Sequence, residues 1–312
     1  MQTCSRPTRH PPHDRCDRAP LGPVPRVNAP TSPPPGIEVE RLDDGAIVVA
    51  RINRPHRRNA LDSQTLAELH RLLDDVDSDP SARVLVLTGV GAAFSAGADI
   101  KALPGDLIDV AATPRTALQA SATSAVAVTF SAQDLMASTF EKVHRLRQPV
   151  IAAVNGSALG GGFALALACD IRIASPSATF GAVFIRYGVS ACDMGTSYHL
   201  PRLVGASRAA ELMLTGRVFD AGEAHDIGLV HTIVDPAELL ETALAKAREI
   251  ACNSPLAVWM TKETMWQNVD APSLRHALDI ENRTQVMCTA TGDLAQSFAA
   301  FRDDGTAQWS QL

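Results

Sequence analysis

Cysteine is scarce in this sequence and unpaired. The six cysteines are spread over 312 residues without a CxxC pair, which argues against a disulfide-stapled fold and against a metal site. His10 and His13 have no third candidate ligand beside them, so we predict no metal there either. Scattered thiols of this kind are typical of a reducing cytoplasm.

Long apolar runs and an excess of positive charge are also missing. No apolar stretch is long enough to span a membrane, and the N-terminus lacks the apolar core of a secretory signal. The net charge of −6 argues against a nucleic-acid partner. We therefore expect a cytoplasmic protein with neither a membrane nor a nucleic acid as partner.

Residues 1–36 differ from the rest of the chain. Proline and arginine dominate this segment, and apolar periodicity is absent. Such a composition cannot bury enough surface to become ordered, so the sequence predicts a disordered leader. A basic, proline-rich tail that binds a partner remains the alternative.

Residues 37–235 alternate between strand and helix patterns, which predicts an α/β core. The run at 83–88 is continuously apolar, so we expect that strand to be covered on both faces. Residues 102–131 have weak periodicity and predict a mobile loop, with room for one helix, that could form a lid or a pocket wall. The expected strands are 46–53, 83–88, 150–154, 171–174, 178–181 and 229–234, and the expected helices are 63–76 (capped by Asp62), 131–147, 196–203, 207–215 and 221–226.

Residues 236–312 are helical throughout, with helices expected at 236–251, 255–268, 272–290 and 292–301. These helices carry more apolar side chains than a small domain surface needs, so we predict that part of the region packs between subunits. A core within one chain is the alternative. The side chains in question are Val258, Met260, Met265, Trp266, Val286 and Met287.

Gly160, Gly161 and Gly162 open a short apolar helix between two apolar strands. Glycines at a helix start leave free N–H groups, and the helix dipole favours a negative oxygen there. The run therefore predicts a site for a phosphate, a carboxylate or an oxyanion. Tight helix–strand packing would explain the glycines equally well, whereas a P-loop is disfavoured because no GK[ST] follows.

Five stretches resemble the crotonase (enoyl-CoA hydratase/isomerase) superfamily in order and spacing. The resemblance covers 37–302 and implies an α/β fold, a spiral of ββα units with a C-terminal helical trimerisation region. It also implies a homotrimer or dimer of trimers, a role in fatty-acid or related acyl-CoA metabolism, and an acyl-CoA thioester as ligand, with no cofactor besides the coenzyme A of the substrate. The stretches are RPHRRNALD, LTG, FSAGADIKAL, PVIAAVNGSALGGGFALALACDIRIAS and GTSYHLPRLVGASRAAELMLTGRVFDAGEAHDIGLVHTIV.

The resemblance also implies roles for particular residues. The backbone amides of Ala98 and Gly161 would hold the thioester carbonyl oxygen as it becomes enolate-like. Arg57 and Arg58 would contact the phosphates of coenzyme A, although a solvated loop is their alternative role. The residues implied at the adenine end are Ala96, Asp99, Ile100 and Lys101.

The sequence departs from the hydratases of this family at both catalytic glutamates. Ala164 stands where the GGGxE motif has its glutamate, and Phe184 stands in place of the glutamate of FGxPE. Neither side chain can move a proton, so the usual addition of water has no visible catalyst. An enzyme with a relocated acid/base and a non-catalytic protein that binds CoA thioesters both remain open.

Asp193 is the best replacement for the missing acid/base. Dienoyl-CoA isomerases carry an extra aspartate in this loop, and 4-chlorobenzoyl-CoA dehalogenases carry one three residues before a TSY triplet, as Asp193 does here. The dehalogenase pattern also needs a Trp at Phe184 and a His at Ala137, so that activity is not carried over. The alternative for Asp193 is an N-cap of the helix near Thr196.

Other polar residues near Asp193 are weaker candidates: Arg186, Tyr187, Cys192 and His199. Asp170 is expected to fix the adjacent backbone. Glu141 and His144 are expected to have surface or core roles.

Overall fold

The computed structural model describes residues 36–99, 125–303, 305 and 307–310. The chain divides into two units, Met1–Pro34 and Pro35–Leu312, and every described residue belongs to the second. The predicted leader over 1–36 therefore lies outside the described residues apart from Gly36, as does most of the predicted loop over 102–131. The predicted division of the chain at residue 235 stays a prediction.

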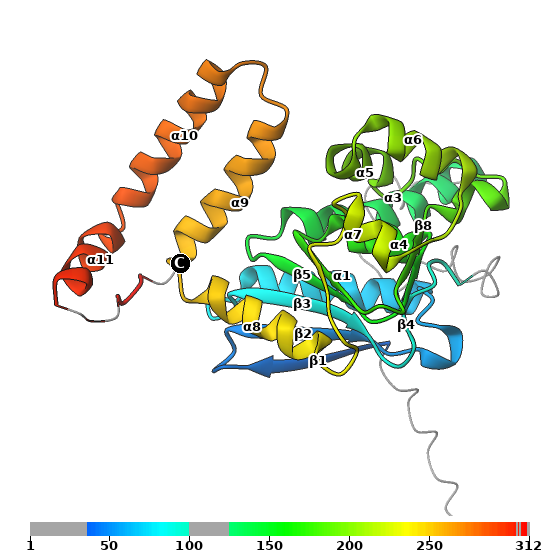
Figure 1. Cartoon of the computed structure of the whole chain (residues 1–312), viewed down its shortest axis with the longest axis horizontal. Helices are drawn as coiled ribbons and strands as arrows, with labels where there is room; N and C mark the ends of the chain where they lie inside the picture. The colour runs from blue at the N-terminus through cyan, green and yellow to red at the C-terminus, as the bar shows by residue number, and fades with distance from the viewer. Residues whose placement is uncertain (1–35, 100–124, 304, 306, 311–312) are drawn as a thin grey trace, which may run out of the picture. The chain divides into compact units, whose positions relative to one another are not determined.

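The larger sheet has the strand order β1-β2-β3-β5-β7-β10 (Figure 1). β1 and β2 form an antiparallel pair, and the remaining neighbours are parallel. The apolar runs predicted β2, β3, β5 and β7 correctly. The strands are β1 (Ile37–Leu42), β2 (Ile47–Ile52), β3 (Val84–Gly89), β5 (Val150–Val154), β7 (Ile171–Ala174) and β10 (Thr232–Ile233).

Both faces of β3 are buried, as its apolar run predicted. Successive side chains of a strand point to opposite faces. Leu85 therefore joins a core cluster that includes Leu69 of α1 (Ser63–Ser78), while Val84 and Val86 join a second cluster with side chains of α8 (Leu239–Ala251). Figure 1 shows α8 lying across the strands.

A second, smaller sheet has the order β4-β6-β8-β9. Its strands are β4 (Ala93–Ser95), β6 (Ser157–Leu159), β8 (Thr179–Gly181) and β9 (Phe219–Asp220). The sequence did not predict β6, because three residues are too short to show a two-residue period. The order strand, short strand, helix recurs along the chain as β5, β6, α4 and then β7, β8, α5, which confirms the predicted α/β class.

The remaining α-helices follow the predicted order, whereas the short helices η1 and η2 were not predicted. α1 begins after Asp62, whose side chain accepts a hydrogen bond from the Thr65 amide, so the predicted cap is confirmed. The other helices are η1 (Pro55–Arg57), α3 (Ala125–Arg145), α4 (Gly161–Ala168), η2 (Val183–Tyr187), α5 (Thr196–Val204), α6 (Ala206–Thr215), α7 (Ala221–Asp226), α9 (Pro255–Val269), α10 (Leu274–Thr289) and α11 (Asp293–Arg302).

Several boundaries differ from the prediction by one to three residues, and those of α3 and β10 differ most. α3 begins at Ala125, six residues before the predicted start at 131. The strand predicted at 229–234 is reduced to Thr232–Ile233. Its first residues cannot join the sheet because the amides of Leu229 and Val230 both donate to the carbonyl of Ala224, closing the end of α7.

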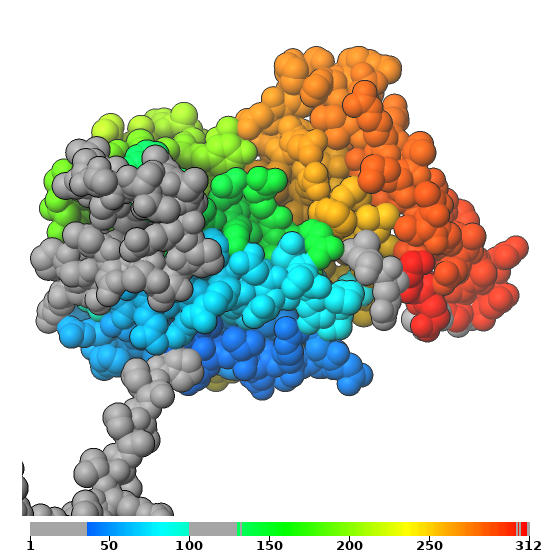
Figure 2. All heavy atoms as spheres, turned by 180° about the vertical axis from the view of Figure 1, so that it is seen from behind, coloured from blue at the N-terminus to red at the C-terminus, as the bar shows by residue number. Residues whose placement is uncertain are grey.

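The C-terminal helices α9 to α11 expose many apolar side chains, and Figure 2 shows α10 and α11 (orange to red) at the surface. Of the side chains singled out in the sequence, Met260 is buried, whereas Met265, Val286 and Met287 are about half or more exposed. Other exposed apolar residues here are Val269, Leu274, Leu294, Phe298 and Phe301. Within the described ranges, none of the helices is long and apolar enough to cross a membrane.

Candidate active site

The two small-residue loops that the sequence singled out meet at the start of α4. Gly97 follows β4 with φ +86, and a Cβ on it would lie 2.6 Å from the Leu159 carbonyl oxygen and 2.9 Å from the Gly161 nitrogen. A side chain at residue 97 would therefore collide with backbone that cannot move aside. Glycine at this position lets the two loops touch.

Gly162 has a purely steric role of the same kind. A Cβ there would lie 2.1 Å from the carbonyl oxygen of Ser95. The packing explanation offered for the glycine run is thus correct for Gly162.

Gly161 has different surroundings. A Cβ there would meet only ordinary contacts, with the Met194 sulfur at 3.5 Å, the Gly97 Cα at 3.6 Å and the Ala98 nitrogen at 3.7 Å. Packing alone does not require glycine at this position. The space beside Gly161 is instead bordered by the amide of Ala98.

The amides of Ala98 and Gly161 have no hydrogen-bond acceptor among the described residues. Leu61 pairs with the amino acids on either side of Ala98: its nitrogen donates to the Gly97 oxygen at 2.8 Å, and its oxygen accepts from the Asp99 nitrogen at 3.0 Å. This pairing leaves the Ala98 amide unused. Gly161 is the first residue of α4, where helical amides lack an intrahelical partner. Two free donors so close together suit one oxygen that gains negative charge.

Asp193 lies on the loop that borders this pair of amides. The next residue, Met194, is buried, has φ +47 and brings its sulfur beside Gly161. The N-cap interpretation of Asp193 is wrong, because the N-cap of α5 is Gly195 and no side chain caps this helix. The carboxylate instead accepts from the Gln133 side chain at 2.5 Å and from the Met194 amide at 2.8 Å. The sequence offered no signal for Gln133, which lies 60 residues away.

Ala164 and Phe184 lie beside the glycine run. Ala164 is fully buried in α4, and its amide donates to the Gly160 carbonyl. Phe184 is partly buried, with a ring atom 3.8 Å from the position of a Cβ on Gly160. Neither residue contributes an ionisable group.

The residues expected to bind coenzyme A have varied surroundings. Arg57 and Arg58 are exposed, and Ala96 donates its amide to the Arg58 carbonyl. Asp99 is buried, and its carboxylate pairs with Arg54 at 2.9 Å. Ile100 and Lys101 lie outside the described residues. The coenzyme A contacts therefore stay predictions.

Arg54 is a structural residue that the sequence analysis missed. Its guanidinium pairs with Asp62 at 2.8 Å and with Asp99 at 2.9 Å, and it also donates to the Ala60 carbonyl. Arg54 thus ties the start of α1 to the loop that carries Ala98.

The weaker candidates near Asp193 are either exposed to solvent or buried in the core. Arg186, Tyr187 and Cys192 are exposed. His199 is buried, with its ring 4.7 Å from that of His144, and burial is the main cause that lowers the pKa of His199 to about 3. A histidine that stays neutral at physiological pH in a buried ring cluster fits a core role better than acid/base chemistry.

The expectation that Asp170 fixes the backbone is confirmed. Its carboxylate accepts from the Val150 amide at 2.8 Å and pairs with the buried Lys262 at 2.8 Å. His144 is half-buried, and Glu141 is exposed in an ion pair with Arg145. In the part of the chain that the structure describes, no three His, Cys, Asp or Glu side chains come together as a metal site.

The parallel strands β4 and β6 lead into two loops that meet at the start of α4, and each loop carries an amide without an acceptor among the described residues. The model of the enoyl-CoA hydratase/isomerase family matches residues 43–312. The chain therefore belongs to the enoyl-CoA hydratase/isomerase, or crotonase, family, and the family predicted from the motifs is confirmed.

Individual relatives agree with this assignment. The chain is 42% identical over 235 residues to the probable enoyl-CoA hydratase EchA12 of Mycobacterium tuberculosis, covering 75% of this chain and 79% of that protein. It is 35% identical over 259 residues to the short-chain-enoyl-CoA hydratase of Clostridium acetobutylicum, covering 83% and 92%.

Solved structures show the same fold. A probable enoyl-CoA hydratase/isomerase from Mycobacterium abscessus matches with a TM-score of 0.77 and 34% identity, covering 88% of this chain and 98% of that one. A monofunctional enoyl-CoA isomerase from M. smegmatis matches with a TM-score of 0.63 and 36% identity, covering 78% and 98%. The predicted crotonase fold is thereby confirmed.

Proposed function

We propose that this protein binds an acyl-CoA thioester and stabilises its enolate between the amides of Ala98 and Gly161. The observation that carries the proposal is the pair of unpartnered amides, with the Ala98 nitrogen 3.7 Å from the position of a Cβ on Gly161. Loss of a proton next to a thioester carbonyl places negative charge on the carbonyl oxygen. Each preorganised amide contributes roughly 3 kcal/mol to stabilising such an oxygen in the transition state.

The proton chemistry favours isomerisation over hydration. The two positions where the family's hydratases keep glutamates hold Ala164 and Phe184, which cannot move a proton. Asp193 is the ionisable group that we assign as acid and base. A single carboxylate can remove a proton from one carbon and return it to another, which shifts a double bond. Hydration additionally requires activation of a water molecule, for which a second carboxylate is usual in this family.

A second candidate function is non-catalytic binding of a CoA thioester. The uncharged Ala164 and Phe184 favour this candidate, since the oxyanion site alone polarises a thioester without supplying a proton. In both cases coenzyme A enters as part of the ligand, and we infer that no separate cofactor is needed. Exposed Arg57 and Arg58 would meet its phosphates, and Ala96, Asp99, Ile100 and Lys101 would line its adenine end.

The exposed apolar side chains on α9 to α11 support a homotrimer or a dimer of trimers. We also infer a cytoplasmic location in fatty-acid or related acyl-CoA metabolism, with no nucleic-acid partner. Light scattering on the full chain tests the assembly, since a monomer at micromolar concentration contradicts it.

The activity is tested by incubating the protein with crotonyl-CoA, a 3-enoyl-CoA and a 3,5-dienoyl-CoA and following the thioester absorbance. We expect a double-bond shift and no hydration, and we expect Asp193→Asn to lower the rate of the shift to a small residual level while Asp134→Asn, an exposed change on α3, retains the native rate. Activity that survives Asp193→Asn contradicts the role of Asp193. Binding of acyl-CoA without any turnover would favour the non-catalytic candidate.

A further inference from the structure

Only one oxygen of the Asp193 carboxylate accepts hydrogen bonds from the described residues. The side-chain nitrogen Nε2 of Gln133 and the backbone amide of Met194 both donate to the same oxygen, Oδ1. The second oxygen, Oδ2, receives no hydrogen bond from any described residue. Two donors on Oδ1 fix the rotation of the carboxylate and so determine where Oδ2 points.

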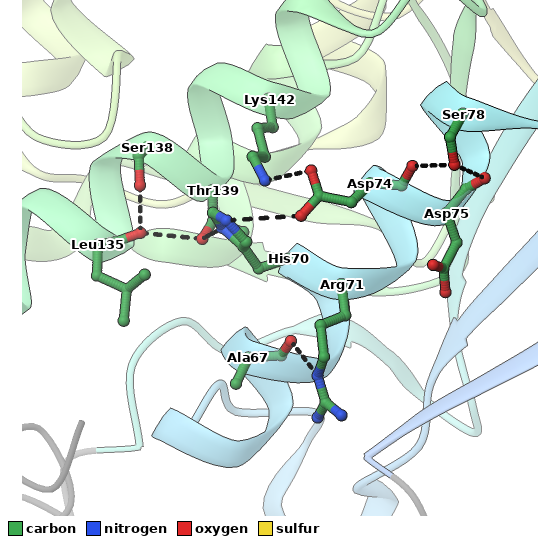
Figure 3. Close-up of polar contacts among 10 residues, drawn as sticks. All are labelled: Ala67, His70, Arg71, Asp74, Asp75, Ser78, Leu135, Ser138, Thr139 and Lys142. Atoms are coloured by element: carbon green, nitrogen blue, oxygen red, sulfur yellow. Dashed lines mark hydrogen bonds and ion pairs between the residues drawn. The ribbon is translucent and has the colours of Figure 1, made fainter. Parts of the chain in front are cut away.

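Gln133 belongs to α3, and Figure 3 shows polar contacts that hold a later part of α3 against α1. Lys142 of α3 pairs with Asp74 of α1 at 2.5 Å. The Thr139 hydroxyl donates to the Leu135 carbonyl, so in its 3.0 Å contact with His70 it accepts a hydrogen bond from Nδ1. Thr139 is fully buried between these helices. Gln133 thus reaches Asp193 from a helix that is fixed against α1.

The second hydrogen bond to Asp193 comes from the loop that borders the amides of Ala98 and Gly161. Met194 supplies the second donor through its backbone, in a left-handed conformation (φ +47) that non-glycine residues rarely adopt. Its sulfur lies 3.5 Å from the position of a Cβ on Gly161. The turn that brings Met194 to the oxyanion site is therefore the same turn that orients Asp193. Strained backbone of this kind is common at functional sites.

We propose that Gln133 is a positioning residue that holds Asp193 so that Oδ2 is the oxygen that moves the proton. The inference rests on the proposed function. Oδ2 takes a proton from C2 of a 3-enoyl thioester, and the C–H electron pair passes to the carbonyl oxygen held by Ala98 and Gly161. The resulting dienolate collapses and takes the same proton from Oδ2 at C4, so that no other reactant is consumed. Correct placement of a reacting group accounts for a large part of enzymatic rate enhancement.

The test is a double-mutant cycle with Gln133→Met, which keeps the length of the side chain and removes the donor. In the native background we expect kcat to fall by about 10- to 100-fold while the acyl-CoA dissociation constant stays within about twofold. In the Asp193→Asn background we expect Gln133→Met to cause no further loss, because Gln133 acts only through Asp193. Asp134→Asn, its exposed neighbour, is the matched control and should change neither quantity.

Equal losses in both backgrounds, or no loss in the native background, overturn the positioning role. Crystal structures of the native protein and of Gln133→Met give a readout that needs no activity: we expect the Asp193 carboxylate to turn away in the variant. A carboxylate that stays in place overturns the inference even if Asp193 proves catalytic. If Asp193→Asn instead leaves turnover intact, the proposed function fails, and the structures still show whether Gln133 orients the carboxylate.

Discussion

The amide nitrogen of Ala98 lies 3.7 Å from the point where Gly161 would carry a Cβ, although Ala98 follows β4 and Gly161 begins α4. A methyl group at that point meets no atom closer than 3.5 Å. It would nevertheless fill the space beside the Ala98 nitrogen. This relationship separates the chemical role that we propose for Gly161 from the steric role of its neighbour Gly162.

Gly161→Ala should therefore fold normally and lose activity. We expect kcat for the double-bond shift to fall by about 100-fold, because the methyl group would keep the thioester oxygen away from the Ala98 amide, and the loss of one such hydrogen bond has an effect of this size. The melting temperature should change little, because the new methyl group makes only ordinary contacts. Steady-state kinetics measure the loss of kcat, and thermal unfolding of the same preparation measures the melting temperature. A variant with native kcat would contradict the oxyanion role of this space.

Gly162→Ala should show the opposite behaviour. Its Cβ would lie 2.1 Å from the Ser95 carbonyl oxygen, so the backbone would have to shift. We expect the free energy of unfolding to fall by about 3 kcal/mol, at the upper end of overpacking costs. Urea unfolding measures the change, with Gly161→Ala as the matched control one residue away. Equal stability of the two variants would show that the close approach does not constrain this helix.

Arg54→Met should destabilise the protein through the loop that carries Ala98. The substitution removes the guanidinium from the carboxylates of Asp62 and Asp99, both largely buried. Loss of the cation from such pairs costs about 2–4 kcal/mol, which urea unfolding would measure. Arg57→Met, an exposed change on η1, is the control and should leave the unfolding free energy within about 0.5 kcal/mol. A loss no larger than that of the control would contradict a structural role for Arg54.

Acid should destabilise the fold through His199. Burial, with smaller contributions from His144, Arg172 and Arg202, lowers the pKa of His199 to about 3, whereas the unfolded chain takes up this proton below about pH 6.5. The unfolded state therefore binds more protons in this window, and stability falls as the pH falls. His199 alone should remove about 2 kcal/mol between pH 7 and pH 5.

His199→Phe should flatten this pH dependence, and His276→Gln, a change at an exposed histidine, should leave it as in the native protein. Unfolding free energies at several pH values check the prediction. An unchanged slope in His199→Phe would mean that other groups, such as His144 or His70, whose pKa values burial also lowers, dominate the acid response.

Secondary structure could be predicted correctly wherever a short segment of the sequence contains the whole pattern that determines it. Apolar runs predicted β3 and β5 because strands buried on both faces need no polar side chains. Asp62 predicted the start of α1 because capping is local. β6 was missed because it is too short to show a period, and the N-cap assigned to Asp193 was wrong because Gly195 takes that position with φ +81.

The sequence by itself determined the family and the two loops of small residues, because motifs with fixed spacing can be recognised without knowing which residues are in contact. Only the tertiary structure decided what each residue of those loops does. Gly162 touches Ser95, whereas Gly161 borders a space beside Ala98. The partners of Asp99 and Asp193, Arg54 and Gln133, lie 45 and 60 residues away. Side-chain hydrogen bonds between residues so far apart in the sequence depend on how the elements pack together. No local sequence pattern predicts that packing.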